Sequence, residues 1–97
     1  MPALDPMIHQ PVRLRIMASL VALGPGDQVD FTWLRGRLGL TDGNLGAHLQ
    51  KLETVRYIKI SKRFVARKPK TYVSLTSRGR VAFEEHVAAL REVIGDE

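Results

Sequence analysis

Residues 40–52 read LTDGNLGAHLQKL, and this stretch decides the fold. Leu45, Leu49 and Leu52 recur at spacings of four and three residues, which is the period of one face of an α-helix. The residues between them are polar or small, so only one side of the helix is apolar. The stretch therefore predicts a helix over about residues 41–55 with a buried leucine line and a polar opposite face.

A second helix directly upstream completes a helix-turn-helix pattern. Phe31, Leu34 and Leu38 have helical spacing and predict a helix of about two turns over residues 31–38. Gly39 can close this helix in a left-handed conformation, which leaves a tight connection before the next helix. Two helices joined in this way are typical of the helix-turn-helix motif.

Farther upstream, the sequence predicts a longer helix and a short strand. Apolar residues recur at spacings of four, four and three between Val12 and Leu23, which predicts a helix over about residues 10–23. The Gly-Pro-Gly sequence at 24–26 ends it. Residues 28–31 are too few for a helix and favour a brief edge strand.

Beyond residue 55 the hydrophobic period changes from about 3.6 to 2. Apolar and polar residues alternate after Tyr57 and again before Leu75, which predicts an antiparallel hairpin over about residues 57–75. Its tip, residues 62–70, is expected to be long and basic.

A last helix is expected over about residues 77–94, capped by Thr76 or Ser77. The element order is then helix, strand, helix, helix, strand, strand, helix. This order describes one mainly helical α+β domain over residues 1–97, a winged helix-turn-helix whose C-terminal helix is available for dimerisation.

The residues that accompany this order resemble a known family. The ordered set consists of Leu40–Leu52, Tyr57-Ile58, Arg67–Tyr72, Leu75-Thr76 and Gly79-Arg80. From about Asp5 to Ile94 it resembles the small stand-alone winged-helix transcriptional regulators of the MarR and ArsR type. The resemblance implies a homodimer that binds specific double-stranded DNA, with the third helix in the major groove and the hairpin, or wing, along the backbone or minor groove.

The charge distribution agrees with a polyanionic partner. The chain has 15 Lys and Arg against 10 Asp and Glu, a formal net charge of +5. No acidic residue lies between Thr54 and Phe83, where nine cations gather: Arg56, Lys59, Lys62, Arg63, Arg67, Lys68, Lys70, Arg78 and Arg80. An excess of this kind, concentrated in one segment, indicates an electrostatic footprint for nucleic acid. A solvated surface without a partner is the alternative.

The candidate DNA contacts come from the third helix and from the wing. On the helix they are Thr41, Asp42, Gly43, Asn44, Ala47, His48 and Lys51, and on the wing Lys62, Arg63, Arg67, Lys68, Lys70 and Thr71. Asn44 can pair with the N6/N7 edge of adenine, or can be a capping or solvated amide. The resemblance implies that His48 contacts a base edge or a phosphate, and the alternative is a structural histidine partly against the core. Phosphate contact would strengthen as the ring protonates near pH 6.5. The resemblance selects Arg67 for the minor groove.

The two terminal helices are the expected dimer surface, because both carry wide apolar stripes. The candidate dimer residues are Leu4, Ile8, Val12, Phe83, Val87, Leu90 and Ile94. A monomer in which the last helix packs entirely on its own core is the alternative.

Several function classes are excluded or disfavoured. The absence of cysteine excludes disulfides, thiolate metal sites and cysteine nucleophiles. No catalytic motif is present, so we expect no enzyme, cofactor or resident metal, although His86 with His9 across a dimer interface could hold zinc or nickel. The apolar runs are too short to span a membrane, which favours a cytoplasmic protein. The competing function is a winged helix that docks onto protein without reading DNA, and any small-molecule effector stays unknown.

Overall fold

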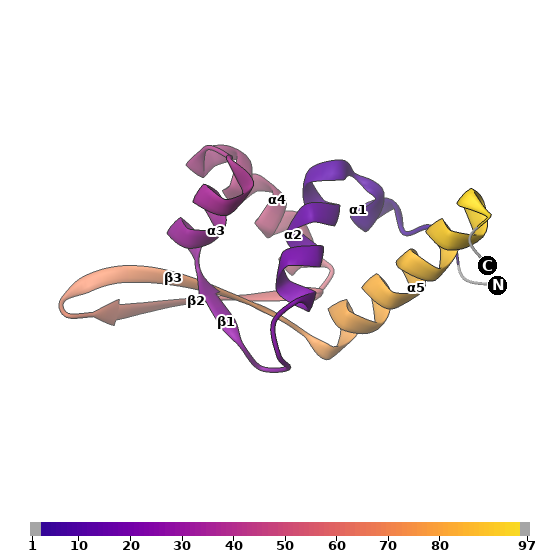
Figure 1. Cartoon of the computed structure of the whole chain (residues 1–97). Coiled ribbons are helices and arrows are strands. Elements are labelled where there is room, and N and C mark those ends of the chain that lie inside the picture. The colour runs from indigo at the N-terminus through magenta and orange to yellow at the C-terminus, as the bar shows by residue number, and fades with distance from the viewer. Residues whose placement is uncertain (1–2, 96–97) are drawn as a thin grey trace.

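The computed structural model describes residues 3–95 and shows a mainly helical α+β winged helix (Figure 1). The elements of these residues are α1 (Pro6–His9), α2 (Pro11–Val21), β1 (Gln28–Asp30), α3 (Phe31–Leu38), α4 (Asp42–Thr54), β2 (Ile58–Val65), β3 (Lys68–Leu75) and α5 (Ser77–Ile94). From α2 onward this order is the predicted one.

Capping residues set where the two helices of the helix-turn-helix begin and end. Asp30 caps α3 by accepting hydrogen bonds from two backbone N–H groups of its first turn. The helix ends at Gly39, whose φ of 65° lies in the left-handed region. Thr41 then caps α4 by accepting a hydrogen bond from the backbone N–H of Asn44. The predicted tight connection between the helices is therefore confirmed.

The first predicted helix is α2, and a short helix that the sequence did not predict, α1, precedes it. Gln10 has an extended backbone, with φ −66° and ψ 129°, and separates α1 from α2. Pro11 explains the break, because the residue before a proline is disfavoured from the α-helical region. The helix expected over about residues 10–23 is therefore confirmed as α2, and the unpredicted α1 packs against α2 and α5.

The sheet is antiparallel with the strand order β1-β3-β2, and β2 with β3 forms the wing. Val65 pairs with Lys68, so the turn consists of Ala66 and Arg67 alone, with φ of 52° and 66°. Two positive φ values are typical of a type I′ hairpin turn. The expected long loop over 62–70 is therefore wrong: both faces of the outer ribbon are open to water, so its strands continue without apolar alternation.

The core lies where α2, α3 and α4 cover the sheet. Leu45, Leu49 and Leu52 are almost completely buried, which confirms the predicted leucine line. They pack in one cluster with Ile8, Ile16, Met17, Leu20, Leu34, Leu38, Ile58 and Val73. This burial of one face fixes α4 so that its other face points outward.

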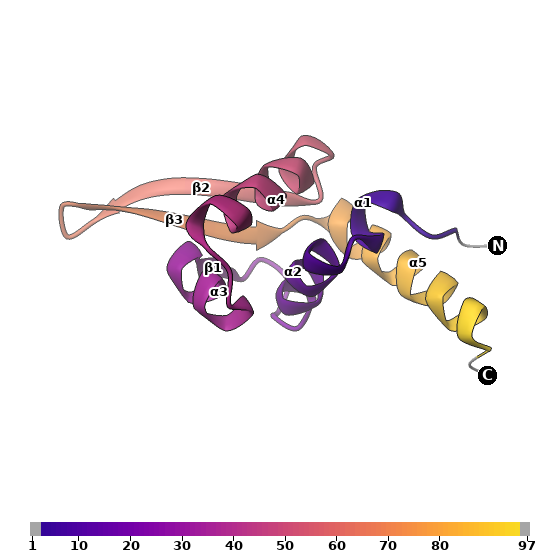
Figure 2. The same ribbon diagram turned by 90° about the horizontal axis from the view of Figure 1, so that it is seen from above.

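The molecule is elongated, 50 × 25 × 21 Å, with the wing at one end and α5 at the other (Figures 1 and 2). At the start of α5, Gly79 is buried so tightly that a Cβ there would overlap the carbonyl oxygen of Tyr57. Farther along, α5 packs against α1 and α2, whereas its last residues, 91–95, are exposed. None of the helices within residues 3–95 is long and apolar enough to cross a membrane.

Candidate nucleic-acid interface

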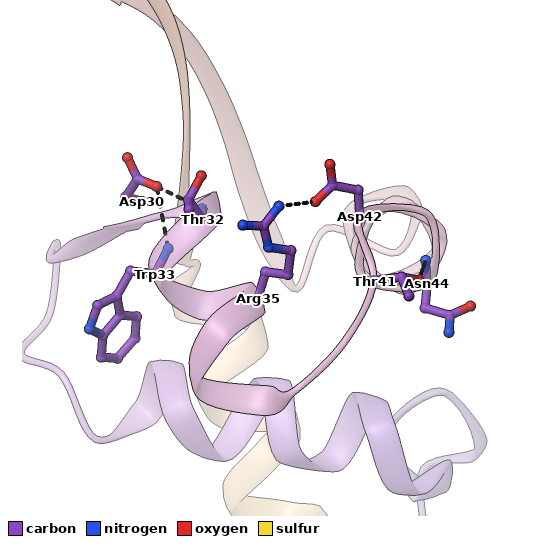
Figure 3. A network of polar contacts seen from close by, with 7 residues as sticks. All are labelled: Asp30, Thr32, Trp33, Arg35, Thr41, Asp42 and Asn44. Carbon is purple, nitrogen blue, oxygen red and sulfur yellow. Dashed lines mark hydrogen bonds and ion pairs between the residues drawn. The ribbon is translucent and has the colours of Figure 1, made fainter.

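The outward face of α4 is uncovered at every predicted contact position opposite the leucine line except His48. Thr41, Asp42, Gly43, Asn44, Ala47 and Lys51 are all exposed. Thr41 is the helix cap, so the capping alternative considered for Asn44 does not apply. The Asn44 side chain points away from the helix and makes no hydrogen bond to another described residue (Figure 3). Its amide is therefore available to a ligand.

An ion pair links the start of α4 to α3. Arg35 Nη1 lies 2.5 Å from Asp42 Oδ1, and Figure 3 shows both side chains between the two helices. Asp42 is an acidic first-turn residue, so it also interacts favourably with the helix dipole. Arg35 offsets a negative charge that would otherwise oppose a phosphate backbone at this place. The sequence reasoning missed Arg35, although it stands one helix before Asp42 on the same predicted motif.

His48 is half-buried on the side of α4 that faces α2. Its Nδ1 lies 3.3 Å from Nη1 of Arg13, a residue that the sequence reasoning also missed. Burial, and then the positive charges of Arg13 and Lys51, lower the pKa of His48 below its ordinary value. The ring is therefore neutral at pH 7, which argues against the expectation that protonation near pH 6.5 would strengthen DNA contact.

Some cations of the outer wing contact other side chains of the protein, and others do not. Arg63 stacks over the ring of Tyr72, with the guanidinium carbon 4.3 Å from the ring centroid, and Lys70 lies 3.5 Å from a carboxylate oxygen of Asp30. The side chains of Lys62, Arg67 and Lys68 are exposed and make no ion pair or hydrogen bond to another described residue. Of the predicted wing contacts, these three cations are therefore free to neutralise another molecule's charge.

Asp30 joins α3 to the wing at the same end of the molecule. Partial burial raises the pKa of Asp30. Hydrogen bonds from the backbone N–H groups of Thr32 and Trp33, together with the charge of Lys70, outweigh this effect and hold the pKa below its ordinary value (Figure 3). Asp30 therefore stays ionised and holds Lys70 in place. The adjacent Trp33 is 48% exposed and carries the guanidinium of Arg37 at 5.6 Å from the ring centroid.

A hydrogen bond fixes the wing relative to α4. Glu53 of α4 accepts a hydrogen bond of 3.1 Å from the backbone N–H of Ile60 on β2. Between the two elements lies a groove of about 360 Å³, whose lining includes Gly46, Lys62 and Thr71. The half-buried Thr71 pairs with Lys62 across the wing, so both predicted contacts border this groove.

The candidate dimer residues are less uniform. Val87 and Leu90 are half-buried, whereas Leu4 and Ile94 are exposed, Ile94 by 75%. Val12 and Phe83 are partly buried against the core. Ile8 is completely buried in its own protomer, so it offers no surface to a partner and we remove it from the dimer set.

The two histidines considered for a metal lie together in a single chain. The rings of His9 and His86 are edge to face, with centroids 5.5 Å apart. His86 is fully buried, and its Nδ1 accepts a hydrogen bond from the backbone N–H of Asp5. No group of three side chains that could ligate a metal occurs in the part of the chain that the structure describes.

Comparison with known proteins agrees with this geometry. The model of a family described as a winged helix DNA-binding domain matches residues 12–94. The uncharacterized protein MJ0432 of Methanocaldococcus jannaschii is 38% identical over 76 residues, which are 78% of this chain and 79% of that protein.

Solved structures give the same result. A transcriptional regulator homologue from Pyrococcus horikoshii OT3 is 31% identical with a TM-score of 0.82, over 92% of this chain and 85% of that one. The YusO protein of Bacillus subtilis has a TM-score of 0.71 at 21% identity, over 88% of this chain and 57% of its own, and shares the fold. The matching family is one of DNA-binding domains, and the Pyrococcus horikoshii protein is described as a transcriptional regulator homologue. With nearly the whole core inside the matched range, the chain belongs to the winged helix DNA-binding domain family.

Proposed function

We propose that the protein is a homodimeric transcriptional regulator that binds specific sequences in double-stranded DNA. The observation that carries the proposal is the uncovered polar face of α4 beside an extended wing with free cations. A helix of this size fits the major groove, where each base pair presents a distinct pattern of hydrogen-bonding groups. Because such a regulator has to reach the chromosome, the proposal includes a cytoplasmic location.

The two elements have different tasks in this proposal. Asn44, in the first turns of α4, has a free amide that can pair with adenine. Lys62, Arg67 and Lys68 neutralise phosphates, and Arg67 at the turn is placed to enter a narrow minor groove. The remaining predicted contacts, apart from His48 and Asp42, position the protein on the backbone of the duplex.

The homodimer is proposed on the outer part of α5. Val87, Leu90 and Ile94 form one apolar line toward the end of the helix, half-buried at Val87 and Leu90 and exposed at Ile94. Pairing such lines in two copies would give a two-fold symmetric protein whose recognition helices meet half-sites about 34 Å apart. The operator would then be roughly palindromic.

Selection of binding sequences from random duplex DNA tests this proposal directly. The expected result is a roughly palindromic site whose half-sites are one helical turn apart. Affinity for that site should fall by about 1000-fold or more between about 50 and 200 mM salt if about six phosphates are contacted. No enrichment, together with a flat salt dependence, would instead favour a module that docks onto protein.

A further inference from the structure

The side chain of Arg13 connects the first helix to α4. Its Nε donates a hydrogen bond of 2.6 Å to the carbonyl oxygen of Met7 in α1. Its Nη1 lies 3.3 Å from Nδ1 of His48. One guanidinium therefore spans from α1, across α2, to the helix that we propose reads DNA.

This contact decides which nitrogen of His48 carries the proton. Arginine has only hydrogen-bond donors, so Nδ1 of His48 must be the acceptor. In the neutral ring the single proton then lies on Nε2. The ring is neutral at pH 7 because burial and the neighbouring charges of Arg13 and Lys51 lower its pKa.

The protonated nitrogen is open to the outside. Nε2 of His48 has no hydrogen-bond partner among the described residues. If this nitrogen were buried, it would be a buried polar atom without a partner. Within residues 3–95 that description applies to Nε2 of His86 and not to Nε2 of His48. The Nε2–H group of His48 is therefore accessible to solvent at the edge of the proposed interface.

We propose that Arg13 is a positioning residue for sequence recognition, which fixes His48 as a hydrogen-bond donor toward the DNA. The proposal rests on the proposed function. A donor can bond N7 or O6 of guanine, N7 of adenine or O4 of thymine in the major groove. The other tautomer would present an acceptor and would select the amino groups of cytosine or adenine. The tautomer of His48 therefore determines which bases its ring can hydrogen-bond.

Arginine suits this role better than lysine. Its rigid planar fork makes two hydrogen bonds in fixed directions, here to a backbone carbonyl on one side and to a ring nitrogen on the other. Lysine keeps the charge but cannot hold both groups in one plane. Arg13→Lys therefore separates the positioning effect from the charge.

The first experiment uses the full chain without DNA. Long-range ¹H–¹⁵N spectra of the histidine rings should show His48 with a bare Nδ1 and a protonated Nε2. In Arg13→Lys the ring should shift to a mixture of tautomers. Arg15→Lys is the matched control, because Arg15 lies on the same helix and donates to the carbonyl oxygen of Leu38, not to a ring. A protonated Nδ1 in the wild type, or the same tautomer in Arg13→Lys, would overturn the proposal.

The second experiment repeats the DNA selection with the variants. Arg13→Lys should lose preference at one position of each half-site by about fivefold to tenfold, the lower end of what one base contact contributes. Arg15→Lys should select the wild-type site. In a His48→Gln background the amide carries its own donor, so adding Arg13→Lys should change nothing further.

The two proposals can fail separately. Unchanged base preference in Arg13→Lys, despite an altered tautomer and a native amide spectrum, would refute the role of Arg13 in recognition and leave the proposed function intact. If the wild type itself selected no sequence, the proposed function would fail, and the recognition role of Arg13 with it.

Discussion

Gly46 and Gly79 both lie in helices but differ in what surrounds them. A Cβ at Gly46 would have no atom within 4 Å, whereas one at Gly79 would overlap the backbone of Tyr57. Glycine in a helix interior costs about 1 kcal/mol relative to alanine. At Gly46 no contact within the protomer compensates for this cost. At Gly79 the missing side chain allows the start of α5 to lie against the backbone of Tyr57.

Alanine should therefore have opposite effects at the two positions. Gly46→Ala should raise the free energy of unfolding by up to about 1 kcal/mol. Gly79→Ala should lower it by about 1–3 kcal/mol or more, because the packed backbone must move. Urea unfolding followed by circular dichroism measures both. Equal effects at the two sites would mean that the close approach of α5 to Tyr57 is not a constraint.

His86 makes the stability of the fold depend on pH. Its burial first, and then the nearby His9, lower the pKa of His86 below the ordinary 6.5, although Asp5 partly opposes this. Protonation would also place a proton on Nδ1, which accepts the hydrogen bond from the backbone N–H of Asp5. The folded state thus binds fewer protons than the unfolded state at mildly acidic pH.

Stability should accordingly be full above about pH 6.5 and fall as the pH decreases toward the depressed folded pKa. His48, whose pKa is lowered as well, adds to the same slope. Unfolding free energies measured from pH 8 to pH 5 test this. His86→Asn, whose amide oxygen takes the place of Nδ1 and can still accept from Asp5, should be less stable at pH 8 but should show a flatter slope. An unchanged slope in that variant would exclude His86 as a source.

At the scale of the element, the wing separates affinity from specificity. Replacing Arg67 and Lys68 together with alanine should weaken binding to all duplexes alike. It should reduce the slope of log affinity against log salt by about 0.9 for each phosphate that the variant no longer neutralises. Asn44→Ala should instead weaken only the selected site, because it removes a base-reading amide and no charge.

Titrations at several salt concentrations measure these slopes. The control is Lys59→Ala with Arg78→Ala, which removes two exposed cations away from the turn and should leave the slope almost unchanged. If the control lowered the slope as much as the wing variant, the net charge of the protein and not the wing would govern binding.

The elements also show what the sequence can and cannot predict. α3 and the leucine line of α4 were predictable because their apolar period reports directly on burial. The length of the wing strands was not, because residues 62–65 and 68–70 are solvated on both faces and carry no alternation. The start of α2 was predictable from Pro11, which suits the first turn of a helix, whereas the four residues of α1 are too few to show a helical period.

The candidate site was predictable to the level of faces but not of partners. The predicted contacts of α4 other than the half-buried His48 are exposed as the helical period predicts, because position on a helix follows from spacing. The Arg35–Asp42 and Arg13–His48 pairs join residues from different helices. Such contacts depend on how the helices cross, and a single sequence has no signal for that.

At the scale of the whole molecule, the N-terminal segment ties three distant elements together. Asp5 caps α1, accepts a hydrogen bond of 2.5 Å from the Tyr57 hydroxyl and donates its backbone N–H to His86 of α5. Burial, followed by the hydrogen bond and charge of Asp5, raises the pKa of Tyr57 to about 12. The phenol is therefore protonated throughout the physiological range and remains a donor. The base of the wing, α1 and α5 are thus held as one body.

The outer part of α5 lies beyond this body, and its use as a dimer contact is the last prediction. Leu90 and Ile94 lie one helical turn apart on the proposed contact line, whereas Val81 lies on the opposite side of the same helix. Leu90→Glu with Ile94→Glu places like charges across a two-fold axis and should convert the dimer to a monomer.

Size-exclusion chromatography with light scattering measures the mass of the variant. In DNA titrations the variant should bind a single half-site, but its affinity for a palindrome of two half-sites should be no higher. Val81→Glu is the matched control, since Val81 is an apolar residue of α5 with 53% exposure and should leave the dimer intact. A dimer that survives the double substitution would move the interface away from the end of α5. A wild type that is already a monomer would show that each α5 serves its own protomer, and the operator would then need no symmetry.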